Sequence, residues 1–295
     1  MAAQTRALVS GPWLADAIRS KLVGPKLRIL DSSWYLPKTK RDPKDEFAQT
    51  HITGSSFFDI DECCDKTSAF DHMLPTSSHF SEYVGGLGIG NDTHVVVYDT
   101  SDFGSFSAPR VWWMFRLFGH SLVSVLDGGM KNWLAEGYPV TAEHSKPERR
   151  KFEATLNQSW VKSYEDVVEN ISTKQVQVVD ARSAARFRGT EPEPRDGILS
   201  GHFPGTINMP FTSFLNASGK KQGTESLSEL FRDAGVDLEQ PLWATCGTGV
   251  TACHVVLAAH LLGHPGVCVY DGSWCEWFKR ASPEHIISEG EGKKV

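Results

Sequence analysis

The sequence predicts an α/β protein built from two tandem domains, each a central parallel sheet flanked by helices. The chain has 295 residues, which is enough for two domains that each bury a core. Short β-branched runs, such as 95–98 and 176–179, alternate with segments of helical length, as in parallel sheets covered by helices. The second half of the chain also repeats the motifs of the first half.

The repeated motifs follow the same order in both halves. From Leu27 the first half reads LRILDSSW, HITGSSFFDID, HVVVYDTSD, APRVWWMFRLFGH and VSVLDGGMKNWLAEG. From Val176 the second half reads VQVVDARSA, HFPGTINMPF, LWATCGTG, TACHVVLAAHLLGH and VCVYDGSWCEWFKR. Two copies of one fold are therefore expected. Pro109 indicates the first turn of a helix in the first copy, and Gly119 and Gly263 indicate where the two equivalent helices end.

We place the first domain at residues 1–140, a linker at 141–163, the second domain at 164–285 and a flexible tail at 286–295. The linker is polar and charged, as exposed connecting segments usually are. The tail ends in SEGEGKKV and has few side chains that could be buried, so we expect it to be loosely ordered.

Composition excludes several classes of protein. The 30 basic and 36 acidic residues give a net charge of -6 and are dispersed along the chain, so no nucleic-acid partner is expected. No apolar run approaches the ~20 residues of a membrane span, and the N-terminus has no apolar signal-peptide core, which predicts a soluble, intracellular protein. The six cysteines lack CxxC spacing, so we expect free thiols, with neither a disulfide framework nor a metal site.

The stretch LWATCGTGVTACHVVLAAHLLG places Cys246 between a strand-like run and an apolar helix. Cys246 should therefore lie at the carboxyl end of a strand, where ligands bind in open α/β sheets. Gly247 and Gly249 permit positive φ, so the loop amides and the helix N-terminus can favour an anion, here the thiolate of Cys246. These features make Cys246 a candidate nucleophile.

A buried cysteine that only fills space is the simpler interpretation of any thiol at a strand end. This interpretation is less favoured here because the equivalent turn of the first copy, DTSDFGSFSAPR, is three residues longer and has no cysteine. One copy is thus expected to be catalytic and the other supporting. Cys253, expected about two turns into the helix, and Cys268, in an apolar strand, are interpreted as packing residues.

Several segments resemble the rhodanese family, and the resemblance covers nearly the whole chain. CGTGVTACHV resembles the persulfide loop of this family, RFRGTEPEPRDG its substrate-binding segment, and FFDID with DHMLP its interdomain residues. The resemblance is to members that use 3-mercaptopyruvate. It implies two tandem rhodanese-like domains, the second catalytic, and sulfur transfer from 3-mercaptopyruvate through a Cys246 persulfide to thiol acceptors or cyanide, with release of pyruvate.

The expected chemistry and the resemblance also indicate which cofactors, partners and cellular location to expect. No metal, nucleotide or flavin is required, because the sulfur travels on the cysteine. The partners are a small-molecule substrate and thiol acceptors, among them thioredoxin, with no nucleic acid and no membrane. Such enzymes occur in the cytoplasm and the mitochondrion, and Arg6 and Arg19 outnumber Asp16 in the first 20 residues, as in a transit peptide.

Site residues follow from the chemistry and from the matched motifs. Arg186 and Arg195 flank FRGTEPEP, and by resemblance they hold the substrate carboxylate, for which the planar guanidinium is suited. The alternative is ordinary pairing of these arginines on the surface with Glu191, Glu193 or Asp196, which is also our interpretation of Arg188. The loop residues implied to bind substrate are Gly247, Gly249, Val250 and Thr251.

A proton relay is implied through Thr248, His72 and Asp61. The family usually has serine where this chain has Thr248, so the hydroxyl is retained with a stiffer side chain. His72 and Asp61 belong to the first copy, so the relay requires that segment to pack over the loop. Without the resemblance, His72 would be interpreted as an ordinary loop histidine.

Three other functions are compatible with parts of this sequence. A thiosulfate:cyanide sulfurtransferase shares the two-domain plan, but in that enzyme basic residues follow the cysteine where this chain has Gly247 and Thr248. A cysteine phosphatase needs arginine six positions after its cysteine, and this chain has Ala252 there. A noncatalytic binding module fits the first copy but leaves Cys246 without a role.

Overall fold

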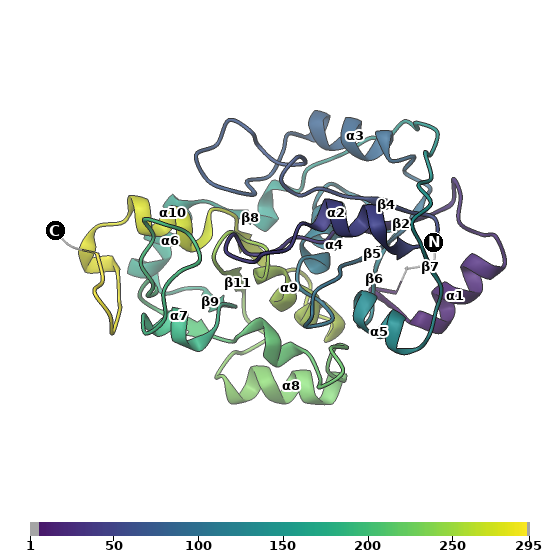
Figure 1. Ribbon diagram of the computed structural model, residues 1–295. Coiled ribbons are helices and arrows are strands. Elements are labelled where there is room, and N and C mark those ends of the chain that lie inside the picture. Colours follow the sequence, from purple (N-terminus) through teal and green to yellow (C-terminus); the bar gives the residue numbers. More distant parts are fainter. Residues whose placement is uncertain (1–5, 294–295) are drawn as a thin grey trace.

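The computed structural model describes residues 6–293, and two five-stranded parallel sheets form the centres of its two halves (Figure 1). The strand order is β1-β6-β5-β2-β4 in the first sheet and β8-β12-β11-β9-β10 in the second. Equivalent strands of the two copies therefore occupy equivalent places. The predicted duplicated α/β fold is confirmed.

The bounds of the strands agree with the short apolar runs of the sequence. The central strands β5 and β11 are buried along nearly their whole length, as expected where helices cover both faces of a sheet. A separate antiparallel pair joins β3 and β7. The strands are β1 (Leu8–Val9), β2 (Leu27–Asp31), β3 (His51–Ile52), β4 (Ser55–Phe57), β5 (His94–Tyr98), β6 (Val123–Leu126), β7 (Val140–Thr141), β8 (Val161–Lys162), β9 (Gln177–Asp180), β10 (Thr206–Asn208), β11 (Leu242–Thr245) and β12 (Cys268–Tyr270).

Helices begin and end where the turn chemistry of the sequence indicates. Pro109 lies in the first turn of α4, while Gly119 and Gly263 follow the equivalent helices α4 and α9 with φ of +84° and +87°. None of the helices in the described part of the chain is long and apolar enough to cross a bilayer. The helices are α1 (Gly11–Arg19), α2 (Pro43–Gln49), α3 (Ser77–Gly86), α4 (Ala108–Leu117), α5 (Gly129–Ala135), α6 (Tyr164–Thr173), α7 (Ala184–Arg188), α8 (Thr224–Asp233), α9 (Ala252–Leu261) and α10 (Ser273–Arg280).

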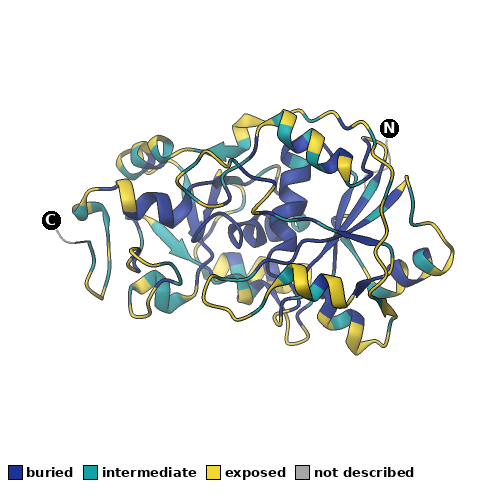
Figure 2. Ribbon diagram, turned by 45° about the horizontal axis from the view of Figure 1, so that its top comes forward, coloured by how far each residue is buried: buried dark blue, intermediate teal, exposed yellow. Residues whose placement is uncertain are grey.

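The two domains share one continuous apolar core. Helices α4 and α9 pack against each other at the centre of the molecule, and both are buried on nearly every side (Figure 2). Each helix covers its own sheet with one face and the other domain with the opposite face. This double packing explains why α9 has an apolar sequence all round, where a helix with one solvent-facing side would show a polar stripe.

The predicted linker follows the surface of the first domain. Arg150 N–H donates to the carbonyl of Gly85 at 2.9 Å, and Thr155 N–H donates to that of Phe118 at 3.0 Å. Strand β8 lies inside the segment 141–163 but pairs with β12, so the second sheet begins before residue 164.

The segment predicted as a flexible tail contacts the second domain. Ile287 forms an antiparallel bridge with His202, and the Lys293 ammonium donates to the carbonyls of Phe278 and Ala281 at 2.8 and 2.6 Å. Its mobility stays a prediction, and residues 294 and 295 lie outside the described part.

In the first domain, the loop that corresponds to the cysteine loop uses the side chain of Asp99 to bind its own backbone N–H groups. It spans 99–107 against 246–251 in the second domain, which confirms the predicted three-residue difference. The Asp99 carboxylate accepts hydrogen bonds from the N–H groups of Phe106, Ser107 and Ala108 at 2.8, 3.0 and 2.8 Å. Burial raises the pKa of Asp99, although these hydrogen bonds act in the opposite direction.

A buried ion pair joins the domains beside this shared core. The Arg110 guanidinium of α4 donates to Asp271 Oδ1 at 2.8 Å, and the two side chains are 1% and 4% exposed. Arg110 also lies over the Trp113 ring, with 4.8 Å from its guanidinium carbon to the ring centroid. Since Asp271 follows β12, this pair links α4 of the first domain to the carboxyl edge of the second sheet.

We expect Asp271→Asn to destabilise the protein strongly, because it leaves the Arg110 charge buried without its counterion. The loss in free energy of unfolding should be roughly 3–5 kcal/mol, measured by urea denaturation. The control is Asp16→Asn, which removes an exposed ion pair with Arg19 and should cost less than about 1 kcal/mol. Equal losses in the two variants would show that the buried pair does not hold the domains together.

Candidate active site

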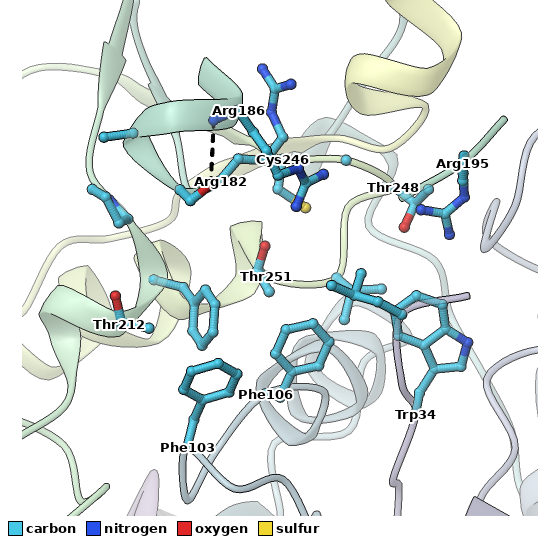
Figure 3. Close-up of a pocket in the computed structure, with 17 residues that line it drawn as sticks. Trp34, Phe103, Phe106, Arg182, Arg186, Arg195, Thr212, Cys246, Thr248 and Thr251 are labelled. Carbon is cyan, nitrogen blue, oxygen red and sulfur yellow. Dashed lines mark hydrogen bonds between the residues drawn. The ribbon is translucent and has the colours of Figure 1, made fainter. Parts of the chain in front are cut away.

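Cys246 lies at the start of a tight loop between β11 and α9, at the carboxyl edge of the second sheet. Its side chain reaches a pocket of about 480 Å³ although the residue is only 2% exposed (Figure 3). This is the edge at which open α/β sheets bind ligands.

The two loop glycines serve different needs. Gly249 has φ of +77°, and a Cβ there would lie 2.9 Å from Arg110 Nη1. Gly247 is not among the positive-φ glycines, so the permitted left-handed conformation is used at Gly249 only. A Cβ at Gly247 would lie 3.2 Å from Arg186 Nη2, so its missing side chain leaves room for that guanidinium.

The loop keeps its backbone donors available. Within residues 6–293, no group accepts a hydrogen bond from the N–H groups of residues 247–251. Free N–H groups beside a helix N-terminus form a favourable environment for an anion. The first domain has an aspartate carboxylate in the equivalent loop, whereas the second domain has the Cys246 thiol.

The pocket has a polar side and an apolar side. Figure 3 shows Cys246, Arg186 and Arg195 on one side and Trp34, Phe103 and Phe106 on the other. Of the predicted site residues, seven line the pocket: Arg186, Arg195, Cys246, Gly247, Thr248, Val250 and Thr251. Gly249, His72 and Asp61 do not line it and lie behind the loop, as the contacts described below show.

Each of the two predicted arginines has a buried donor without a partner. Arg186, on α7, forms an ion pair with Glu193 through Nη2, and its Nε has no hydrogen bond within the described residues. Arg195 Nε donates to Asp71 Oδ2 at 2.7 Å, while its Nη2 has no acceptor there. Unpaired buried donors are costly, so these two side chains are suited to an anionic ligand in the pocket.

The alternative, pairing with Glu191, Glu193 or Asp196, names the partner of Arg186 correctly but not that of Arg195. Glu193, the partner of Arg186, is 1% exposed, so that pair is buried. Arg195 pairs with Asp71 of the first domain, while Asp196 pairs with Lys38 at 3.2 Å.

One charged residue that lines the pocket, Arg182, was not among the residues expected there from the sequence. Arg182 is buried and donates to Asp180, to Glu193 Oε1 at 2.8 Å and to the carbonyl of Gly201 at 2.6 Å. Because it occupies one oxygen of Glu193, Arg182 fixes the carboxylate that orients Arg186. The signal was its position two residues after the end of β9, the strand beside β11.

The residues proposed for a relay lie within hydrogen-bond distance across the domain boundary. His72 Nδ1 is 2.9 Å from Thr248 Oγ1, and His72 Nε2 is 2.9 Å from Asp61 Oδ1. The carboxylate can only accept when ionised, so Nε2 carries the proton and the Thr248 hydroxyl donates to Nδ1. Trp34 Nε1 donates to the other Asp61 oxygen at 3.1 Å. Burial alone would raise the pKa of Asp61, but the hydrogen bonds from His72 and Trp34 outweigh it and lower that pKa.

The interdomain ion pair holds this segment in place. Arg110 Nη2 donates to the carbonyl of His72 at 2.6 Å, and Arg110 Nη1 donates to that of Gly249 at 3.3 Å. Asp271 Oδ2 accepts the N–H of Leu74 at 2.8 Å. His72 has φ of +62°, a strained conformation for a residue with a side chain, and these contacts maintain it.

The other cysteines do not line the pocket. Cys253 is the second residue of α9, not two turns into it, because the helix begins directly after the short loop. Burial raises the pKa of the Cys253 and Cys63 thiols, and raises that of Cys275 to about 11. Cys246 is the one cysteine that lines the pocket. No cluster of His, Cys, Asp or Glu between residues 6 and 293 has the arrangement of a metal site.

Comparison with known proteins gives a consistent family. The rhodanese-like domain model matches residues 14–136 and again 163–280. The 3-mercaptopyruvate sulfurtransferase of Homo sapiens is 56% identical over 288 residues, covering 98% of this chain and 97% of that protein. The thiosulfate sulfurtransferase of Rattus norvegicus is 58% identical over 291 residues, covering 98% of each.

A solved structure agrees with these relatives. The crystal structure of SseA from Escherichia coli, described as showing the rhodanese fold and catalytic mechanism of 3-mercaptopyruvate sulfotransferases, superposes with a TM-score of 0.81 at 35% identity. The match covers 92% of this chain and 99% of that one. With two matched domains, a common sheet topology and relatives aligned over nearly their full length, the chain belongs to the rhodanese family.

Proposed function

We propose that this protein is a 3-mercaptopyruvate sulfurtransferase that carries the transferred sulfur on Cys246. One observation carries the proposal: the cysteine opens into a pocket beside two guanidinium groups that each have an unpaired buried donor. A donor with one carboxylate and one thiol matches this arrangement. The high identity to the human enzyme of that name supports the same assignment.

The arginines bind the donor. Arg186 Nε and Arg195 Nη2 hold the carboxylate and keto oxygen of 3-mercaptopyruvate, because charged donors form the stronger hydrogen bonds. Glu193 and Asp71 orient the two side chains from behind. The substrate sulfur is then presented to Cys246 on the same side of the pocket.

Sulfur transfer proceeds by nucleophilic catalysis in two halves. The Cys246 thiolate attacks the substrate sulfur, a sulfur–sulfur bond forms, and the carbon–sulfur bond breaks with its electron pair leaving on the pyruvate enolate. The free N–H groups of residues 247–251 stabilise the negative persulfide that results. In the second half, a thiolate or cyanide attacks the outer sulfur and restores the Cys246 thiolate.

The proton balance of the first half requires one transfer. The substrate thiol loses a proton, and the departing enolate carbon gains one to become pyruvate. The Thr248 hydroxyl lines the pocket and is backed by His72 and by the ionised Asp61, so it carries that proton.

Acceptors and location extend the proposal. We propose that thiols, among them thioredoxin, take the sulfur, and that the enzyme acts in the cytoplasm and the mitochondrion. Support for both comes from the family resemblance. The exposed Phe103 at the apolar side of the pocket is consistent with an acceptor that approaches from there.

Thiosulfate is the second candidate donor, and the identity to the rat thiosulfate sulfurtransferase favours it. Whole-chain identity does not separate the two candidates, since it is 56% in one case and 58% in the other. The loop charge does: Gly247 and Thr248 add no cation for a divalent donor. Thiosulfate should therefore be the poorer substrate.

The donor assignment predicts a higher kcat/KM for 3-mercaptopyruvate than for thiosulfate in initial-rate measurements. Intact mass after donor treatment should show one added sulfur on the peptide containing Cys246, and Cys246→Ser should abolish turnover. Replacing Gly247 and Thr248 with Arg and Lys should move the preference toward thiosulfate. Equal or reversed preference in the natural protein would contradict the assignment, and sulfur found on Cys253 or Cys63 would contradict the role of Cys246.

The arginine clamp predicts that Arg186→Ala and Arg195→Ala each lose about 1.5–3 kcal/mol of transition-state stabilisation, which is roughly tenfold to a hundredfold in kcat/KM. Lysine at either position should restore activity only in part, because a point charge lacks the planar fork. Arg188→Ala is the matched control, since Arg188 lies on the same helix and does not line the pocket. Unchanged kcat/KM in both pocket variants would show that these two arginines do not hold the substrate.

The relay predicts that Thr248→Val slows persulfide formation by about a hundredfold, because the variant keeps the shape but loses the proton donor. Thr248→Ser retains the hydroxyl and should keep most of the activity. Single-turnover release of pyruvate without an acceptor measures this step. A Val variant as fast as the Ser variant would show that the hydroxyl moves no proton.

A further inference from the structure

Two buried residues of the described chain have positive φ without being glycine, and both lie around the cysteine loop. His72 is held by the interdomain ion pair, whereas Ser273, with φ of +51° and no exposed surface, is the first residue of α10. The remaining two, Lys21 and Lys174, are exposed. Strained backbone that is buried at a reactive site is commonly part of its mechanism.

We propose that Ser273 is a positioning residue for the Cys246 nucleophile. The inference rests on the proposed function, because it concerns how that thiol is held for attack. Ser273 does not line the pocket, so it acts through Cys246 and not on the substrate.

The hydroxyl of Ser273 is fully used around the cysteine. It donates to the carbonyl of Tyr270 at 2.8 Å, and it accepts from the N–H of Cys246 and from Thr245 Oγ1, both at 3.2 Å. A serine hydroxyl has one donor and two acceptor sites, so no capacity is left over. The peptide group that precedes Cys246 is therefore fixed in orientation.

The backbone next to Ser273 holds the other side of the cysteine. The N–H of Trp274 donates to the carbonyl of Cys246 at 2.9 Å. Two consecutive residues thus clamp the N–H and the C=O of Cys246. The left-handed conformation of Ser273 presents its hydroxyl and the following N–H to the same residue, which explains why the strain is tolerated.

The first domain provides an internal comparison. Gly129 makes the equivalent turn with φ of +53°, and the N–H of Met130 donates to the carbonyl of Asp99 at 3.0 Å. The turn and the clamp on the carbonyl are therefore common to both copies, and glycine makes that turn without strain. The strained serine, with its hydroxyl, occurs only in the copy that has the cysteine.

The test separates the hydroxyl from the strain. Ser273→Ala removes the hydroxyl and keeps the strained backbone, whereas Ser273→Gly removes both. We expect both variants to form the persulfide roughly tenfold more slowly in single turnover, with KM for 3-mercaptopyruvate nearly unchanged. The Tm of the glycine variant should exceed that of the alanine variant, since only glycine relieves the positive φ.

Lys174→Gly is the matched control, because it relieves the same strain at an exposed residue at the end of α6. It should raise Tm and leave the rate of persulfide formation unchanged. Alkylation of Cys246 by iodoacetamide gives a readout that needs no sulfur donor. Its rate at a fixed pH should fall in both Ser273 variants, because the thiol is no longer held in place, and should stay unchanged in Lys174→Gly.

Two outcomes would overturn the positioning role. One is a natural rate in both Ser273 variants. The other is a rate that follows Tm, with the glycine variant restored and the alanine variant slow. A natural protein that takes sulfur from thiosulfate but not from 3-mercaptopyruvate would contradict the donor assignment instead, and the same variants measured with thiosulfate would still decide the role of Ser273.

Discussion

The buried ion pair between Arg110 and Asp271 is the interaction on which the site depends. Through one guanidinium it connects α4 of the first domain to the carbonyls of His72 and Gly249, and through Asp271 it connects to the N–H of Leu74. The hydrogen bond between His72 and Thr248 therefore has both of its ends anchored by the same pair. Both residues of this pair must be present, since either one alone would be a buried charge without a counterion. The two domains consequently form one functional unit.

The two domains share one architecture but differ in the loop that follows the central strand. Both copies end the central strand in a loop with backbone donors at a helix N-terminus. In the first copy Asp99 satisfies those donors permanently, so the loop is closed and supports the domain interface. In the second copy the loop is shorter, the donors of residues 247–251 are free, and Cys246 has the corresponding place. The second domain thus has a cysteine thiol where the first has the carboxyl group of Asp99, and the left-handed Ser273 where the first has Gly129.

Selectivity for the donor is a local property of the pocket. Overall identity is nearly equal for relatives named after two different donors, so it does not distinguish between the donors. The guanidinium groups of Arg186 and Arg195 are each paired with one carboxylate, which leaves only part of their donor capacity for a ligand. The loop next to the thiolate contributes no further cation. The pocket thus favours a modest negative charge on one side and offers an aromatic wall on the other.

The sequence alone determined the duplicated α/β fold, the short loop after the central strand of the second sheet and the place of Cys246 at the end of that strand. It could do so because hydrophobic periodicity, turn residues and repeated motifs are read within short segments of the chain. It also placed Arg186, Arg195, His72 and Asp61 through a family resemblance, although the contacts of these residues could not be derived from local pattern. Tertiary structure decided those contacts: Thr248 meets His72 across 176 positions, Arg195 pairs with Asp71 of the other domain, and Arg110 reaches Asp271. The physical reason is that these contacts exist only once α4 packs against α9, and that packing depends on the shape of the shared core, which no single segment of the chain contains.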